Sequence, residues 1–185
     1  MGEGLVVLIS GRGSNLQAIL KSPVGAQVIS VISDDPNASG LDIAQKAGID
    51  TYVVAAADFS VVAEFEEKLV ELLQAIAPKI IALAGFMCIL TPTIVQSFAG
   101  RIVNIHPSLL PNFPGLRTHE RALAAGEKEH GCTVHWVIEE IDAGGIIAQK
   151  KVPVRVDDTA DTLAARVLAE EHRLYPAVLA DLLAT

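Results

Sequence analysis

Along this chain, short apolar runs alternate with longer segments in which apolar residues recur every three or four positions. The apolar runs are rich in Val and Ile and are bounded by Gly, Pro, Asn or Asp, which is the pattern of buried strands. They lie at residues 5–9, 26–32, 51–54, 79–84, 102–106, 131–138 and 146–154. Helical spacing is found at 16–20, 41–47, 59–76, 118–125 and 163–183, and a further helix is expected to begin at 92.

This order of elements predicts the fold class. Strands that alternate with helices form a mostly parallel central sheet with helices on both faces, in a Rossmann-like α/β fold. The two C-terminal strands are expected to add an antiparallel edge, because Pro153 near the end of the last strand suits an edge position. A length of 185 residues predicts one domain, spanning 1–185.

Charged residues interrupt the helical segment 59–76 at Glu64, Glu66, Glu67 and Lys68. We expect these charges to form a solvated face of the helix. The whole chain carries a formal net charge of −8 and has no Lys/Arg run, which disfavours nucleic acid as a partner. The expected partners are small-molecule substrates.

The cysteines and the hydropathy of the chain indicate its compartment and whether it binds a metal. Cys88 and Cys132 form neither a disulfide framework nor a metal pattern, and His130 and His135 lack the spacing of a zinc helix, so we expect no metal. The N-terminus does not resemble a signal peptide, and no apolar stretch is long enough to span a bilayer. These features predict a cytoplasmic protein without membrane contact, either a monomer or a homodimer.

A glycine-rich turn follows the first apolar run. Gly11 and Gly13 precede Ser14, Asn15 and a helical segment. Backbone N–H groups that converge at such a helix N-terminus form an anion site, so the turn favours phosphate binding. It is only half of a dinucleotide fingerprint, because Leu16 stands where the third Gly would be. The alternative is a tight turn in which Ser14 caps the helix.

The run at 102–106 carries two polar residues, Asn104 and His106, to the end of a strand. Side chains two residues apart point to the same face of a strand, so both can reach one small volume. An amide and an imidazole placed together can donate hydrogen bonds to an oxygen that becomes negative. The alternative is a capped strand end with a satisfied His.

Three other connections contribute candidate groups. Asp34 or Asp35 stands about where a ribose-binding acid falls in dinucleotide enzymes, although an Asp-Pro turn is the simpler interpretation and is preferred. The apolar connection 85–90 is either core filling or a slot for a flat ring. The loop 139–145 holds Asp142.

Several chemistries are excluded by the residues present. The chain has no Gly-x-Ser-x-Gly elbow, and Cys88 has no adjacent base that would make it a nucleophile. An amide, an imidazole and a carboxylate beside an anion loop suit acyl transfer without a covalent enzyme intermediate.

The motifs then show a specific resemblance. They are Ser10–Gln17, Leu83–Met87, Asn104–Pro111, Pro114–Leu116, and Asp142 before Gly144. Over nearly the whole chain, in order and spacing, they resemble the phosphoribosylglycinamide formyltransferase family, folate-dependent enzymes of purine biosynthesis. The resemblance implies that 1–185 is a formyltransferase domain. It also implies that 10-formyltetrahydrofolate, as co-substrate, gives its formyl group to the amine of glycinamide ribonucleotide.

The resemblance also implies roles for individual residues. The catalytic positions are Asn104, His106 and Asp142. Asn104 and a protonated His106 would stabilise the oxyanion. Asp142 would keep His106 protonated and help move the proton. The ribonucleotide positions are Gly13, Ser14, Asn15, Gly85, Pro107 and Glu171. The folate positions are Met87, Cys88, Ile89, Leu90, Val137, Glu139 and Glu140. The family often has Arg where this chain has Cys88, so a side-chain contact to the folate's glutamate tail is in doubt.

Related functions share parts of this pattern. Methionyl-tRNA formyltransferase has the same Asn-x-His core but carries an extra domain for tRNA. Formyltetrahydrofolate hydrolase, or another formyltransferase of the superfamily, is the main alternative, and the hydrolase resembles this family with an added regulatory domain. A non-catalytic nucleotide-binding module would explain the Gly loop but not Asn104, His106 and Asp142.

Overall fold

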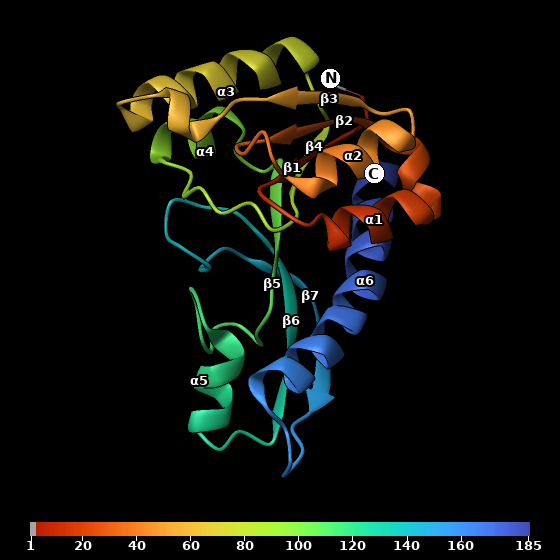
Figure 1. Cartoon of the computed structure of the whole chain (residues 1–185), viewed down its shortest axis with the longest axis vertical. Helices are drawn as coiled ribbons and strands as arrows, with labels where there is room; N and C mark the ends of the chain where they lie inside the picture. Colours follow the sequence, from red (N-terminus) through yellow and green to blue (C-terminus); the bar gives the residue numbers. More distant parts are fainter. Residues whose placement is uncertain (1–2) are drawn as a thin grey trace.

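A seven-stranded sheet forms the centre of the molecule in the computed structural model, which describes residues 3–185 (Figure 1). The strands are β1 (Leu5–Ile9), β2 (Val28–Ser33), β3 (Asp50–Val53), β4 (Ile80–Leu83), β5 (Ile102–His106), β6 (Glu129–Trp136) and β7 (Ile146–Pro153). Their order across the sheet is β3-β2-β1-β4-β5-β6-β7. The first five are parallel, and β6 pairs antiparallel with both β5 and β7, so the predicted mostly parallel sheet with an antiparallel C-terminal edge is confirmed.

Helices cover both faces of this sheet, as predicted. They are α1 (Ser14–Lys21), α2 (Ser39–Lys46), α3 (Val62–Ile76), α4 (Pro92–Ser97), α5 (Thr118–Ala124) and α6 (Ala160–Ala184), with short 3₁₀ turns η1 (Pro23–Gln27) and η2 (Ala56–Asp58). Figure 1 shows α1, α2 and α6 on one side and α3 and α4 on the other. In residues 3–185 no helix is both long and apolar enough to cross a membrane.

The alternation of side chains along β1 shows how the two faces form. Leu5, Val7 and Ile9 join the core under α1, α2 and α6, whereas Val6 and Leu8 join the core under α3 and α4. All five side chains are fully buried, because a central parallel strand is covered on both faces. The continuous apolar run therefore reflects two cores that share one strand.

Several element boundaries differ from the sequence prediction, and three of the differences have a clear cause in the structure. β2 begins at Val28, not at residue 26, because Pro23 starts a 3₁₀ turn that continues to Gln27. The helix expected from 59 begins at Val62, after the turn η2. β6 spans Glu129–Trp136 instead of 131–138, because its first residues pair with the end of β7.

The predicted solvated face of α3 is wrong for one residue. Glu64, Glu67 and Lys68 are exposed, but Glu66 is 2% exposed. It accepts hydrogen bonds from the backbone and hydroxyl of Thr91 at the start of α4. Burial of this carboxylate is possible because both of its oxygens have donors.

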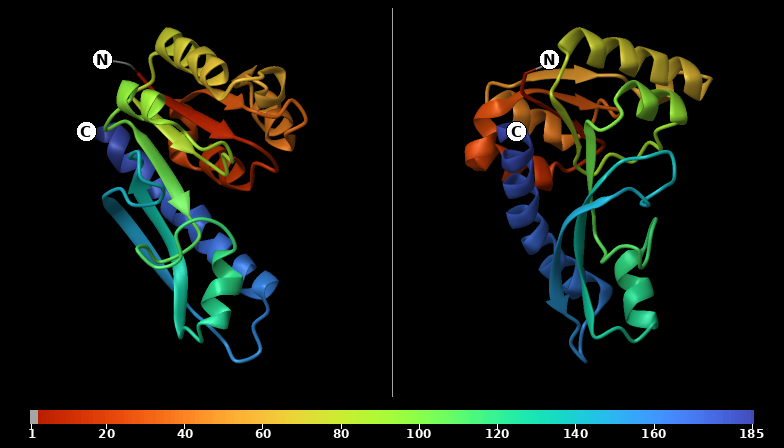
Figure 2. Two further views of the ribbon diagram at one scale, coloured as in Figure 1. Left: turned by 90° about the vertical axis from the view of Figure 1, so that its left-hand side faces the viewer. Right: turned by 180° about the vertical axis from the view of Figure 1, so that it is seen from behind.

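The connections fix where a ligand can bind. From β1 the chain passes to β2 and β3 on one side and later to β4 and β5 on the other, so β1 and β4 flank a change in strand order. Open α/β sheets bind ligands beyond the carboxyl ends of strands at such a point. Here the Ser10 N–H donates to the Gly85 carbonyl and joins the loops that follow β1 and β4. Figure 2 shows β6 and β7 extending away from these strands as a long hairpin.

Candidate active site

A cavity of about 580 Å³ lies where these strands end. It brings together nearly all of the residues selected from the sequence: Asn15, Gly85, Met87, Cys88, Ile89, Leu90, Asn104, His106, Pro107, Val137, Glu139, Glu140, Asp142 and Glu171. Gly13 and Ser14 are the exceptions, since they do not line it. Segments that are distant in the sequence thus meet in one volume.

His106 is held between two oxygen atoms. Its Nδ1 lies 3.3 Å from Oδ2 of Asp142, and its Nε2 lies 3.0 Å from the carbonyl oxygen of Phe113. Both oxygens are acceptors, so each can take a hydrogen bond from a ring nitrogen that carries hydrogen. The ring is 6% exposed. The two contacts therefore fix the orientation of the imidazole from both sides.

Asp142 is positioned by its own backbone and by a neighbouring loop. It adopts a left-handed conformation with φ 53°, which is uncommon outside Gly, Asn and Asp. The Gly115 N–H donates to Asp142 Oδ2 at 2.7 Å. The same carboxylate oxygen therefore receives a backbone hydrogen bond and faces His106, which orients the carboxylate toward the imidazole.

His135 completes this group, and the sequence analysis considered it only as a possible zinc ligand. It stands opposite Asn104 in the antiparallel pair of β5 and β6. Its Nδ1 lies 3.0 Å from the Trp136 carbonyl and its Nε2 lies 3.2 Å from Nδ2 of Asn104. Burial lowers the pKa of His135, against the opposing effects of the Trp136 carbonyl and Asp142, so its neutral form is favoured.

A neutral His135 determines how Asn104 is oriented. Because the Trp136 carbonyl takes the Nδ1 hydrogen, the Nε2 lone pair of His135 accepts from the Asn104 amide. The second hydrogen of that NH₂ group remains available to the cavity. The strand alternation at 131–138 contained the signal for His135, but only the pairing of β6 with β5 shows which residue it faces.

The glycine turn is built by close backbone packing. Gly13 has φ 72°, and a Cβ there would lie 2.7 Å from Cα of Gly40. The Gly40 N–H also donates to the Gly11 carbonyl at 3.0 Å. Ser14 is the first residue of α1, and within residues 3–185 no side chain caps this helix, so the cap at Ser14 that the alternative interpretation required is not formed. The amide groups at the start of α1 are thus left for another acceptor.

Asn15 and Glu171 form a buried pair beside this turn. Asn15 Nδ2 donates to Glu171 Oε2 at 2.7 Å, and Asn15 Oδ1 is buried with no partner among the described residues. Burial raises the pKa of Glu171, although the hydrogen bond from Asn15 opposes this. A buried acceptor without a donor indicates a position for a ligand group that donates.

The loop after β4 contributes both core and cavity. Leu90 is buried, whereas Met87 and Ile89 are 66% and 69% exposed on the cavity wall. Leu90 therefore agrees with core filling, and the apolar slot for a flat ring stays a prediction for Met87 and Ile89. The Met87 N–H donates to Ser10 Oγ at 2.7 Å, which fixes this loop against the end of β1.

Cys88 is held as a thiol. Its Sγ donates to Oδ2 of Asp34 at 2.9 Å, and burial together with this hydrogen bond raises the pKa of Cys88 to about 12. A thiol in this state is a poor nucleophile, in agreement with the sequence analysis. Asp34 thus bonds to protein, and the neighbouring Asp35 accepts the Asn37 N–H, which is the Asp-Pro turn of the simpler interpretation.

Two further histidines lie close to the cavity. His119 lines it, and its Nδ1 lies 3.1 Å from Nε2 of His130. Burial lowers the pKa of both, to about 4 for His130. The edge of the His130 ring also faces the ring of Phe113, whose carbonyl contacts His106.

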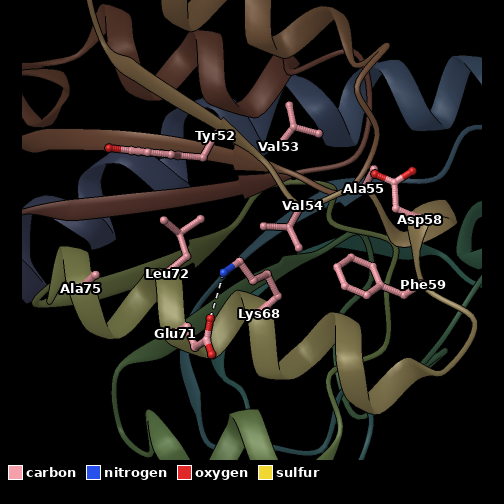
Figure 3. Close-up of a pocket in the computed structure, with 10 residues that line it drawn as sticks. All are labelled: Tyr52, Val53, Val54, Ala55, Asp58, Phe59, Lys68, Glu71, Leu72 and Ala75. Atoms are coloured by element: carbon pink, nitrogen blue, oxygen red, sulfur yellow. Dashed lines mark hydrogen bonds and ion pairs between the residues drawn. The ribbon is translucent and has the colours of Figure 1, made fainter.

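A second cavity, of about 600 Å³, lies between β3 and α3 (Figure 3). Its wall is mostly apolar, with Tyr52, Val54, Phe59 and Leu72, and an ion pair of Lys68 with Glu71 at 2.9 Å. None of the residues selected from the sequence lies there. Without an imidazole, an amide or a buried carboxylate on its wall, it lacks the groups that acyl transfer requires.

Comparison with known proteins agrees with this geometry. A family model described as formyl transferase matches residues 4–179. The chain is 46% identical over 179 residues to phosphoribosylglycinamide formyltransferase of Escherichia coli strain K12, covering 95% of this chain and 84% of that one.

Solved structures give the same result. Phosphoribosylglycinamide formyltransferase from Brucella melitensis has a TM-score of 0.91 at 47% identity, covering 100% of this chain and 97% of that chain. Glycinamide ribonucleotide transformylase 1 from Symbiobacterium toebii has a TM-score of 0.92 at 44% identity, covering 96% and 86%. The chain belongs to the phosphoribosylglycinamide formyltransferase family.

Proposed function

We propose that this enzyme transfers the formyl group of 10-formyltetrahydrofolate to the amine of glycinamide ribonucleotide, in de novo purine biosynthesis. The observation that carries the proposal is the convergence of Asn104, His106 and Asp142 in one cavity. The names of the relatives support the choice of substrates. The cavity offers an apolar wall for a pterin and a buried unpaired acceptor at Asn15 for a polar ligand.

The reaction is a direct attack of the amine on the formyl carbon. The carbonyl oxygen then becomes negative, and Asn104 and His106 donate hydrogen bonds to it. For His106, the donor that remains after pairing with Asp142 is Nε2, so the oxyanion replaces the Phe113 carbonyl as its acceptor. Charge on the imidazole strengthens this bond, because hydrogen bonds between ionised groups are the stronger ones.

Asp142 has two tasks in this scheme. It stabilises the charge of His106, and it receives the proton that the attacking nitrogen loses, through a water molecule. When the bond between the formyl carbon and the folate nitrogen breaks, that nitrogen takes up a proton, so the overall reaction releases none. His135 keeps the Asn104 amide turned with its NH₂ group toward the oxyanion.

The two substrates take different parts of the site, and the phosphate lies beyond the cavity wall, at Gly13 and Ser14. The turn Gly13–Asn15 offers the amides of the α1 N-terminus to the phosphate of the ribonucleotide, and Glu171 lies near its glycinamide end. Gly85 and Pro107 line the same part. The folate side comprises Met87, Cys88, Ile89, Leu90, Val137, Glu139 and Glu140.

We also propose that residues 1–185 form one domain in the cytoplasm. The single sheet supports the first point, since it joins strands from Leu5 to Pro153 and α6 packs against β6 and β7. The two free cysteines, Cys88 and Cys132, suit a reducing compartment.

The decisive experiment offers the purified protein three acceptors. With 10-formyltetrahydrofolate present, formation of tetrahydrofolate and of formylated product is followed with glycinamide ribonucleotide, with methionyl-tRNA, and with water alone. We expect formylated ribonucleotide in an amount equal to the tetrahydrofolate formed. Release of formate without acceptor would identify a formyltetrahydrofolate hydrolase, and transfer to tRNA would identify a different formyltransferase.

A further inference from the structure

The buried carboxylate of Glu66 is unexplained by the chemistry of the site. It lies on α3, outside the cavity wall, and is 2% exposed. Oε1 accepts the Thr91 N–H at 2.6 Å, and Oε2 accepts the Thr91 hydroxyl. Burying a carboxylate is costly unless donors replace its water, so this contact represents a specific attachment of α4 to α3.

Thr91 is the residue at which the folate-side loop becomes α4. It is the N-cap of this helix, and Pro92 follows it. Leu90, directly before it, is buried in the core below α3 and α4. The bond from Glu66 therefore fixes the end of the segment 85–90, while Ser10 fixes its middle through the Met87 N–H.

The other end of α4 reaches the second loop of the folate side. Gln96 Nε2 donates to Glu139 Oε1 at 2.6 Å. Glu139 lies on the cavity wall, in the loop between β6 and β7, 48 positions along the chain from Thr91. A helix of six residues thus connects the two loops that form the apolar side of the cavity.

We propose that Glu66 and Gln96 are positioning residues for the folate: by holding the two ends of α4 they set the spacing of the loops 85–90 and 137–142. The inference rests on the proposed function for the identity of the ligand. Neither residue lines the cavity, so both act through the loops they hold. The bond to Glu66 is partly buried and the bond to Gln96 is exposed, so Glu66 is the stronger determinant.

The test measures both substrates in four variants. Glu66→Ala removes the attachment, Glu66→Gln keeps an acceptor for the Thr91 N–H, Gln96→Ala releases the other end, and Glu67→Ala is the control on the exposed face of α3. We expect Glu66→Ala to raise KM for 10-formyltetrahydrofolate roughly tenfold, as loss of a charge-assisted hydrogen bond implies. KM for the ribonucleotide and kcat should stay within about twofold.

The remaining variants should change KM for the folate by smaller amounts. Glu66→Gln should return KM for the folate to within about threefold of the original value, and Gln96→Ala should raise it about threefold. Glu67→Ala should change nothing. A Glu66→Ala protein with a lower Tm but an unchanged folate KM would show a purely structural role and overturn the proposal. An equal rise of KM for both substrates would do the same.

A measurement without turnover separates this inference from the proposed reaction. Amide hydrogen exchange of the free protein should become faster in both 85–90 and 137–142 in Glu66→Ala. Faster exchange in 85–90 alone would contradict a connection through α4. If the original protein transfers no formyl group, the proposed function fails while exchange still tests the connection. If Glu66→Ala does not fold, Gln96→Ala decides, because its side chain is exposed.

Discussion

The two sides of the cavity are built by opposite means. The polar wall consists of Asn104, His106, His135 and Asp142, whose side-chain atoms contact one another and are largely withdrawn from water. The apolar wall consists of Met87, Ile89, Ile138 and Ile141, which are 45–69% exposed. The loop that carries Met87 and Ile89 is held through its backbone, by Ser10 at Met87 and by Glu66 at Thr91, where the loop ends. The polar wall therefore depends on contacts among its side chains, and the apolar wall depends on how its backbone is held.

The largest effect is expected when a hydrogen-bond donor is removed from the polar wall. Asn104→Ala and His106→Ala should each lower kcat by about 10²–10³, because in the proposed mechanism each removes a hydrogen bond to the developing oxyanion. KM should change little. Met87→Ala on the apolar wall is the matched control and should keep kcat. Steady-state kinetics on both substrates measure this, and a loss confined to KM would place the two residues in substrate binding instead.

Asp142→Asn tests whether the polar wall acts as a unit. We expect kcat to fall at least about a hundredfold, since the amide removes the charge that faces His106. The double variant Asp142→Asn/His106→Ala should be far less than additive. Near-normal turnover of Asp142→Asn would remove the carboxylate from the mechanism.

In the proposed function, the glycine turn binds the ribonucleotide through backbone groups, and a substitution at Gly13 tests this. Gly13→Val should raise KM for the ribonucleotide about tenfold or more, because a Cβ at φ 72° collides with Gly40 and displaces the start of α1. KM for the folate should change little. Gly48→Ala is the control, since Gly48 has φ 74° but no neighbour within 4 Å. If the variant bound the folate poorly and the ribonucleotide normally, the turn would belong to the folate site and the prediction would be wrong.

The sequence predicted the parts of this fold that depend on local pattern. The buried runs, their order and the convergence of Asn104 with His106 follow from periodicity along single strands. His135 was not assigned to the site and Glu66 was wrongly placed on a solvated face, because their contacts are with partners far along the chain, Asn104 across the sheet and Thr91 at the start of α4. A charge on a helical segment looks solvated until the element that covers it is known.

Acidification should lower the stability of the folded protein, and buried His130 should contribute to this loss. The pKa of His130 is lowered to about 4 by burial, so between pH 6.5 and 4 the unfolded chain binds more protons than the folded one. The free energy of unfolding therefore falls as pH falls through this window, and Tm should drop. His130→Gln should show a smaller drop than the original protein when Tm is measured from pH 7.5 to 4.5. Equal slopes for the two proteins would show that this histidine is not a source of acid lability.

The smallest effects are expected on the apolar wall. Cys88→Ala should be tolerated within about threefold in KM for the folate, because a thiol hydrogen bond is weak. Cys88→Arg alone should improve binding of the glutamate tail little, since Asp34 faces position 88 and pairs with the new side chain. Cys88→Arg/Asp34→Asn should bind a polyglutamylated folate better than either single variant. Loss of activity in Cys88→Ala would instead revive a thiol mechanism.

The contact between Gly13 and Gly40 has a consequence for how substitutions at distant positions are tolerated. Gly40 belongs to α2 and lies off the cavity wall, yet a Cβ on it would press on Gly13 and on Ile9. In a saturation mutagenesis screen for growth without purines, Gly40 should therefore score as intolerant as a residue that binds substrate. A smaller residue at Ile9 should restore tolerance only in part, because relief on that side leaves the crowding against Gly13. Intolerance at this position would record the packing of two backbones and would carry no information about ligand contact.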